Sequence, residues 1–236
     1  MFQSNLLALV VTTLIALGWL KFCDLLAARK VVSSQVSRKI IHIGTGPIFV
    51  LCWLLFNDAP GARWLAAIVP LGITLKFLLV GLGVIKDEGD VQSMSRSGDR
   101  RELLRGPLFY GIAFVALTLL FWKESPVGII ALMLLCGGDG AADLAGSHWG
   151  KDSPLPWSSK KSWAGSLAML IFGFALSFAM VLIFNAAGAY SYTFTKLLIS
   201  TGVISLAAML VESLPIGGYD NLAVPLVASV LGLVLF

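Results

Sequence analysis

The sequence predicts an all-α membrane protein, a polytopic bundle of about eight transmembrane helices, with seven as the alternative count. Hydrophobic residues make up 58% of the 236-residue chain and charged residues only 13%, with a mean hydropathy of +0.89, which excludes an ordinary soluble domain. Apolar runs that approach the length needed to cross about 30 Å of hydrocarbon recur along the chain. Because these runs leave no room for a separate soluble domain, we expect one integral-membrane domain over residues 1–236.

The apolar runs differ in length. The first starts at "MFQSN" without a basic region or a small-residue cleavage site, so we expect a retained helix and not a cleaved signal peptide. Six runs are long enough to predict spans, at 5–22, 40–56, 64–85, 106–122, 165–186 and 197–211. Two shorter runs, 126–136 and 222–236, are weaker candidates that complete the count of eight.

Basic residues are concentrated in alternate connections between these runs. Connections 21–39, 86–105 and 137–164 hold 13 of the 17 Lys and Arg residues, Arg96 among them. By the positive-inside rule these connections face the cytoplasm, which places the N-terminus, and with eight spans the C-terminus, outside. Topology signals and contacts with anionic lipids alone would also explain many of these charges.

Acidic residues follow the basic ones, although Asp and Glu contribute little to topology and need another reason to lie near a membrane. All but Asp58 and Glu124 fall in inner connections or at the helix ends that enter them. The three cysteines are scattered with no C-x-x-C pair, which argues against a disulfide framework or a zinc or iron–sulfur site. We therefore expect a site that opens to the cytoplasm and carries mixed charge.

The stretch "CGGDGAADLAGSHWG" places two carboxylates directly after an apolar run. If a helix continues past the glycines, Asp139 and Asp143 lie on one face, one turn apart, where a cation between them would relieve their repulsion. Magnesium suits this pair because it takes one or two carboxylates together with substrate phosphates and water. The glycines would let a ligand approach the backbone closely. The alternative is that Asp139 caps a helix and Asp143 is solvated.

The stretch "SPLPWSSKKSWAGSLAML" combines hydroxyls and two lysines before a helix expected to begin near Gly165. Lys160, Lys161 and Ser162, beside a helix N-terminus, form a pattern suited to anions. The alternative is a pair of topology anchors. Two carboxylates for a metal and two lysines for phosphates, about twenty residues apart on one membrane face, are what a nucleoside triphosphate requires.

Three more inner stretches carry candidate residues. "SRKIIHIGTG" sets His42 one turn after Arg38, where His42 either packs with a satisfied hydrogen bond or orients a substrate hydroxyl. "GDRRELLRGPLFYG" supplies arginines that bind phosphate or form a salt-bridged interfacial turn. "VESLPIGGYDNLAVPLV" places Glu212, Asp220 and Asn221 at helix ends, where they would serve as metal or nucleotide ligands.

Taken together, "SRKIIHIGTGP", "ELLRGPLFYG", "CGGDGAADLAGSHWG" with "SSKKSWAGS", and "ESLPIGGYDNLAVPL" resemble the phytol kinase and farnesol kinase branch of the CTP-dependent polyprenol kinase family. The resemblance runs in order from about residue 37 to 228. Dolichol kinase is a more distant relative, and the middle stretch is also similar to the membrane cytidylyltransferases that make CDP-diacylglycerol. The resemblance implies phosphoryl transfer from CTP, or sometimes UTP, to an isoprenoid alcohol.

The resemblance also implies roles for single residues. It makes Asp139 and Asp143 magnesium ligands, and it places His42 in the family's first motif and Glu212 in its last. From its position, Glu212 is a further candidate metal ligand, and His42 is a candidate general base. Lys160 and Lys161 are then expected to neutralise the charge that develops on the transferred phosphoryl group. It implies phosphate binding by Lys160, Lys161 and Ser162, and it places Arg38 and Lys39 in the family's first motif, Arg105 in its second, and Asp220 and Asn221 in its last. We expect all eight of these residues to bind the nucleotide.

The alcohol and the location follow less directly. Phytol is our first candidate, with geranylgeraniol and farnesol next, and we expect membrane lipids but no nucleic acid as partners. The missing transit peptide favours a bacterial membrane, with a cyanobacterial one as a candidate, over a plastid membrane, and we expect the site to face cytoplasm or stroma. The alternatives are a CTP-dependent cytidylyltransferase, which attacks the α-phosphate, and a transporter with interrupted helices. Against the transporter, the charges gather on one face and no inverted repeat is apparent.

Overall fold

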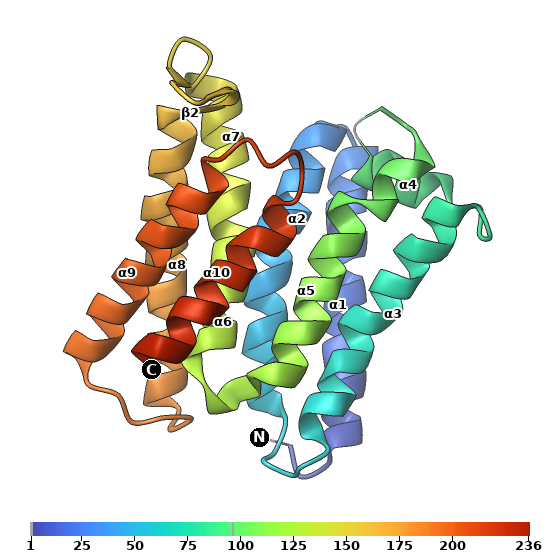
Figure 1. Ribbon diagram of the computed structural model, residues 1–236. Coiled ribbons are helices and arrows are strands. Elements are labelled where there is room, and N and C mark those ends of the chain that lie inside the picture. The colour runs from blue at the N-terminus through green and yellow to red at the C-terminus, as the bar shows by residue number, and fades with distance from the viewer. Residues whose placement is uncertain (1, 96) are drawn as a thin grey trace. The chain divides into compact units, whose positions relative to one another are not determined.

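The computed structural model describes residues 2–95 and 97–236, so Arg96, one of the basic residues counted above, lies outside the described residues. It confirms an all-α polytopic bundle (Figure 1). The helices longer than five residues are α1 (Asn5–Ala28), α2 (Ser34–Cys52), α3 (Ala62–Leu82), α4 (Glu88–Met94), α5 (Gly106–Leu120), α6 (Pro126–Met133), α7 (Asp139–Trp149), α8 (Trp163–Ala186), α9 (Phe194–Glu212) and α10 (Asp220–Leu235). The short helical turns are η1 (Trp53–Leu55), η2 (Arg100–Leu104), η3 (Trp122–Glu124) and η4 (Leu134–Gly138).

Seven helical segments in the described part of the chain are long and apolar enough to cross a membrane. The weak candidate at 126–136 belongs to one of them, because α6, η4 and α7 join into a helical segment from Pro126 to Trp149. The weak candidate at 222–236 lies in α10, which is apolar but has only 16 residues. Seven full-length spans and a shorter apolar helix therefore account for the eight predicted runs.

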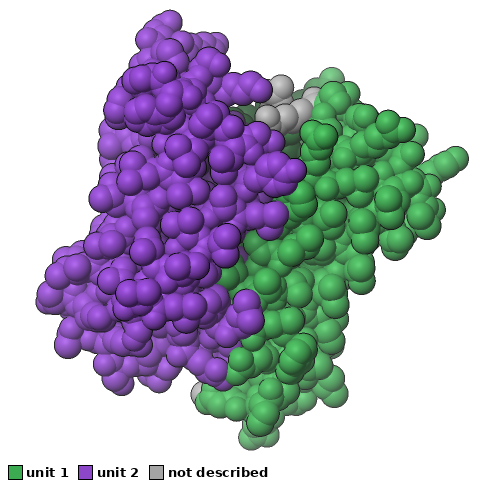
Figure 2. Space-filling model, in the orientation of Figure 1, with its two compact units in different colours: residues 1–119 green, residues 120–236 purple. Residues whose placement is uncertain are grey.

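The chain divides into two compact units, Met1–Leu119 and Leu120–Phe236, coloured separately in Figure 2. The single domain expected from the sequence stays a prediction. In the first unit, Phe77 and Val80 of α3 form a buried cluster with Leu103 of η2. The hydroxyl of Ser37 in α2 donates a 3.0 Å hydrogen bond to the Cys23 carbonyl in α1. These contacts hold the ends of α1, α2 and α3 in place at the connections that the sequence analysis identified as basic.

In the second unit, the segment from Pro126 to Trp149 packs closely on α8. A Cβ atom placed on Gly173 of α8 would lie only 3.2 Å from the Cα of Gly138. The sequence predicted that the glycines before α7 open the backbone to a ligand, whereas in the structure Gly137 and Gly138 allow close helix packing against α8. Between α6 and α7, η4 forms a π-helical turn, a local distortion that is frequent at functional sites.

A small hairpin between α7 and α8 was not anticipated. It consists of β1 (Pro154–Leu155) and β2 (Ser158–Ser162), which pair in antiparallel fashion. The two prolines around Leu155 favour extended backbone at the residues that precede them, which suits a strand and a turn. Ser162 ends β2 and caps α8, since its hydroxyl accepts a 3.2 Å hydrogen bond from the Gly165 N–H. Helix α8 therefore begins at Trp163, two residues before the expected start near Gly165.

Candidate active site

Lys161 in β2 is the centre of a charged cluster in the second unit. Its Nζ atom forms an ion pair with Glu212 and another with Asp220, whose Oδ2 lies 3.0 Å away. The side chains are 21%, 4% and 20% exposed for Lys161, Glu212 and Asp220. Glu212 is the last residue of α9 and Asp220 the first of α10. Lys161 therefore joins the hairpin to both ends of the α9–α10 connection.

A tryptophan side chain holds the hairpin at this position. The indole Nε1–H of Trp157 donates a 3.1 Å hydrogen bond to the Ser213 carbonyl, directly after α9. Trp157 was not predicted from the sequence. In the sequence it is a large aromatic residue that follows two prolines and precedes a polar stretch. This pattern alone does not indicate what the side chain contacts. The hydrogen bond satisfies a carbonyl at the C-terminal end of α9 and fixes β2 beside Glu212.

The electrostatics of Lys161 follow from its neighbours. Burial alone would lower the pKa of the Lys161 ammonium group. The carboxylates of Glu212, Asp220 and Asp139 raise this pKa by more than burial lowers it, so it lies above its ordinary value. Lys161 is therefore charged at neutral pH. Asp139 is the last of the three carboxylates that raise this pKa, so its charge also acts on Lys161.

Asp139 and Asp143 occupy successive turns of α7, as the sequence predicted for a helix that continues past the glycines. Asp139 is half-buried and follows the π-helical turn directly, whereas Asp143 is exposed. Lys160 is exposed beside Lys161, since neighbouring residues of a strand point to opposite faces. Ser162 is buried, and its observed bond is the cap of α8.

The carboxylates of Asp139 and Asp143 are suited to a magnesium ion. Carboxylate oxygens are ligands of the hard kind that magnesium prefers, and it needs only one or two of them when substrate phosphates supply the rest. In the described residues, no three His, Cys, Asp or Glu side chains gather into a metal cluster. The donor set of Asp139 and Asp143 is therefore compatible with a metal shared with a substrate. Glu212, the third predicted ligand, is engaged by Lys161.

The first unit brings together two other predicted stretches. The Tyr110 hydroxyl in α5 donates a 2.8 Å hydrogen bond to the backbone carbonyl of His42 in α2, and the two rings lie 4.5 Å apart. Tyr110 was not singled out from the sequence, although it belongs to the quoted stretch "GPLFYG". Arg38 and Lys39 are half-buried on α2, one turn or less before His42. Tyr110 thus fixes the turn of α2 that carries the candidate base.

The remaining predicted residues lie at helix starts. Arg105 precedes α5 and is exposed, and it borders a pocket in the first unit. Asn221 follows Asp220 in the first turn of α10. In the second unit, the structure thus collects a charged lysine and carboxylates from three segments at the ends of apolar helices. Such a group can bind and orient a phosphate ester together with a metal ion.

Several plant proteins resemble this chain. "Probable phytol kinase 1, chloroplastic" of Glycine max is 42% identical over 205 residues, which are 86% of this chain and 68% of that protein. "Phytol kinase 1, chloroplastic" of Arabidopsis thaliana is 40% identical over 203 residues, 85% of this chain and 66% of that protein. "Farnesol kinase, chloroplastic" of Arabidopsis thaliana is 40% identical over 235 residues, 99% of this chain and 76% of that protein.

No protein-family model matches the chain, and no solved structure matches it. The relatives nevertheless match most of the length of this chain at about 40% identity. They include a protein named phytol kinase and a protein named farnesol kinase. The similarity spans both units and includes the connections that carry Lys161, Glu212 and Asp220. The chain belongs to the family of phytol kinases and farnesol kinases.

Proposed function

We propose that this protein transfers the γ-phosphate of CTP to an isoprenoid alcohol and releases the alcohol monophosphate and CDP. Phytol is the first candidate acceptor, with geranylgeraniol and farnesol as the alternatives. The names of the relatives, phytol kinase and farnesol kinase, support a prenyl alcohol as the acceptor. We place the reaction at the cytoplasmic face of a bacterial membrane or the stromal face of a plastid membrane.

One observation supports this proposal most strongly. The ammonium group of Lys161, the carboxylates of Glu212 and Asp220 and the charge of Asp139 share one electrostatic environment in the second unit. An ammonium group has three N–H donors, of which the two ion pairs use two. The third is available to a phosphate oxygen, so Lys161 can bind a nucleotide without leaving its carboxylate partners.

The roles of the residues follow from charge. Asp139 and Asp143 would hold magnesium, which supplies charge neutralisation on the phosphates when it is bound. Lys161, with exposed Lys160, would position the phosphate oxygens and balance their charge. The His42 imidazole, on a turn of α2 fixed by Tyr110, would accept the proton of the attacking hydroxyl.

The solubility of the two substrates also supports this location. A prenyl alcohol partitions into the bilayer, whereas CTP stays in water, so the reaction must take place where the two phases meet. The Lys161 cluster lies at the ends of α9 and α10 and directly before α8, which are apolar helices. These ends are the expected level of the membrane surface.

The test uses purified full-length protein in detergent with phytol, magnesium and labelled nucleotides. Two preparations of CTP carry the label at the γ- or at the α-phosphate, and γ-labelled ATP is assayed in parallel. We expect γ-label from CTP to enter the organic phase and α-label to stay in the aqueous phase. With phosphatidate in place of phytol, entry of α-label with release of pyrophosphate would instead identify a cytidylyltransferase, and no transfer to phytol, farnesol or geranylgeraniol would overturn the proposal.

A further inference from the structure

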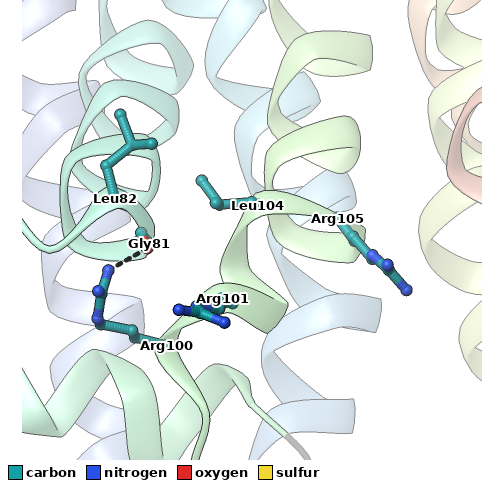
Figure 3. A pocket seen from close by; sticks show the side chains of 6 residues that line it. All are labelled: Gly81, Leu82, Arg100, Arg101, Leu104 and Arg105. Carbon is teal, nitrogen blue, oxygen red and sulfur yellow. Dashed lines mark hydrogen bonds between the residues drawn. The ribbon is translucent and has the colours of Figure 1, made fainter.

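The first unit contains a pocket lined by arginines (Figure 3). It has a volume of about 500 Å³ and lies where α3 ends and η2 leads into α5. Its lining residues are Gly81, Leu82, Arg100, Arg101, Leu104 and Arg105. Three cationic side chains therefore border one pocket together with two leucines.

Arg100 is fixed at the C-terminal end of α3. Its Nη1 atom donates a 2.6 Å hydrogen bond to the Gly81 carbonyl, and its guanidinium group lies against Gly83. Gly83 has φ = 80° and closes α3, and a Cβ atom at this position would lie 2.6 Å from Nη1. A cation at this end of a helix is stabilised by the helix dipole. Since a guanidinium group has five N–H donors, most of the Arg100 donors remain for a ligand.

Arg101 extends toward Arg100, whereas Arg105 points away from both (Figure 3). Arg101 and Arg105 are exposed, and neither forms an ion pair with a carboxylate in the described residues. The neighbouring carboxylate of Asp99 accepts a hydrogen bond from the backbone N–H of Arg101. Two guanidinium groups that face one pocket repel each other. An anion bound between them would attract both groups and so offset this repulsion.

The pocket also has a defined position relative to the apolar helices. One candidate span ends at Leu82, and the next begins at Arg100. Lining residues from the ends of two successive spans lie where lipid headgroups are expected. Leu82 is 55% exposed, and Leu104, which also lines the pocket, is half-buried. The pocket therefore offers cations to an anionic group and apolar contacts to a chain attached to that group.

We propose that this pocket binds the phosphate of an anionic glycerophospholipid, with Arg100 and Arg101 on the phosphate and Leu82 and Leu104 against the apolar part of the lipid. A nucleotide also carries phosphates, but it has no acyl chain for the two leucines. Arg105 points away and remains a candidate for the nucleotide. The lipid site does not depend on the proposed kinase activity, because Arg100 and Arg101 are not assigned to the nucleotide or the metal and because the expected ligand is different.

The experiment measures lipid binding to the full-length protein by native mass spectrometry after delipidation in detergent. The probes are phosphatidylglycerol and phosphatidylcholine with identical acyl chains, each with and without excess CTP. We expect phosphatidylglycerol to bind in preference to phosphatidylcholine and CTP not to displace it. Arg101→Gln should weaken phosphatidylglycerol binding about fivefold, the usual effect of one basic residue near an anionic membrane surface.

The matched control is Arg29→Gln, which removes the same charge from an exposed position at the end of α1 outside the pocket. This variant should bind phosphatidylglycerol as the unmodified protein does. Equal binding of the two lipids, or an equal loss in both variants, would overturn the proposal in favour of unspecific charge attraction. Displacement of phosphatidylglycerol by CTP would overturn it in favour of a nucleotide site.

Discussion

Lys161 in β2 forms an ion pair with Glu212 at the end of α9, 51 positions later in the sequence. The pair joins a hairpin between two helices to the connection that precedes α10. Glu212 is almost fully buried, so its charge depends on this partner. The predicted metal ligand and the predicted phosphate-binding residue thus contact each other in the folded chain.

The ion pair should be important for stability. Removal of one partner of a buried pair leaves an uncompensated charge, so Lys161→Ala should lower the free energy of unfolding by about 3 kcal/mol. The measurement is thermal unfolding of the detergent-solubilised protein, followed by tryptophan fluorescence. Lys160→Ala, at the exposed neighbouring position, should change stability by less than about 0.5 kcal/mol.

A double variant separates charge from packing. In Lys161→Met combined with Glu212→Gln, both charges of the buried pair are absent and only the more exposed Asp220 loses its contact with Lys161, so part of the loss seen in Lys161→Ala should be recovered. Stability as low as that of Lys161→Ala would show that the cluster is held by packing and not by charge.

Asp139 should be needed for activity more than for folding. We expect Asp139→Asn to reduce phosphoryl transfer at least about 100-fold, because the loss of a metal ligand removes several kcal/mol of charge stabilisation in the transition state. The assay is transfer of γ-label from CTP to phytol, with thermal unfolding measured on the same preparation. The matched control is Asp152→Asn, which changes an exposed residue in the turn before the hairpin. This variant should keep normal turnover. Normal turnover in Asp139→Asn would contradict the metal assignment.

The close packing of α8 on the segment that carries Asp139 should not tolerate a methyl group. In Gly173→Ala, the new Cβ would lie 3.2 Å from the Cα of Gly138 and 2.8 Å from the Leu134 side chain. We expect a loss of about 1–3 kcal/mol in the free energy of unfolding, typical of overpacking. Gly202→Ala in α9 is the control, since the nearest atom lies 3.8 Å away, and it should be neutral or slightly stabilising. Equal melting temperatures of the two variants would refute this account.

Asp87 should make stability depend on pH in the acid range. Its Oδ1 atom accepts a 3.0 Å hydrogen bond from the Asp90 N–H, and its Oδ2 atom lies 2.9 Å from Lys76 Nζ. The hydrogen bond from the Asp90 backbone, followed by the one from Lys76, lowers the pKa of Asp87 below its ordinary value. Its stabilising contribution is therefore fully present above the unfolded pKa of about 4, and it is lost as the pH falls through the lower folded pKa.

Asp87→Asn tests this sign, because asparagine can still cap α4 but carries no charge. The melting temperature of the unmodified protein should exceed that of the variant at pH 6, and the difference should shrink toward pH 3. A difference that stays constant from pH 6 to pH 3 would contradict the assignment of the effect to this carboxylate.

Much of the architecture could be predicted from the sequence because the bilayer restricts the choice of structure. Long apolar runs in hydrocarbon must satisfy their backbone hydrogen bonds internally, so they form helices. The spacing of Asp139 and Asp143 predicted that both lie on one face of a helix, and both belong to α7. The short charged motifs indicated the kinase family, which the relatives confirmed.

The tertiary structure decided which of these residues meet. Lys161 and Glu212 were predicted as separate phosphate and metal ligands, but their pairing depends on how α9 ends beside a hairpin that the sequence did not reveal. The glycines before α7 were predicted to leave space for a ligand, but residues of α8 occupy the space beside them. Local sequence carries helix propensity and polarity, whereas contacts over 51 positions arise only when the packed helices bring their ends together.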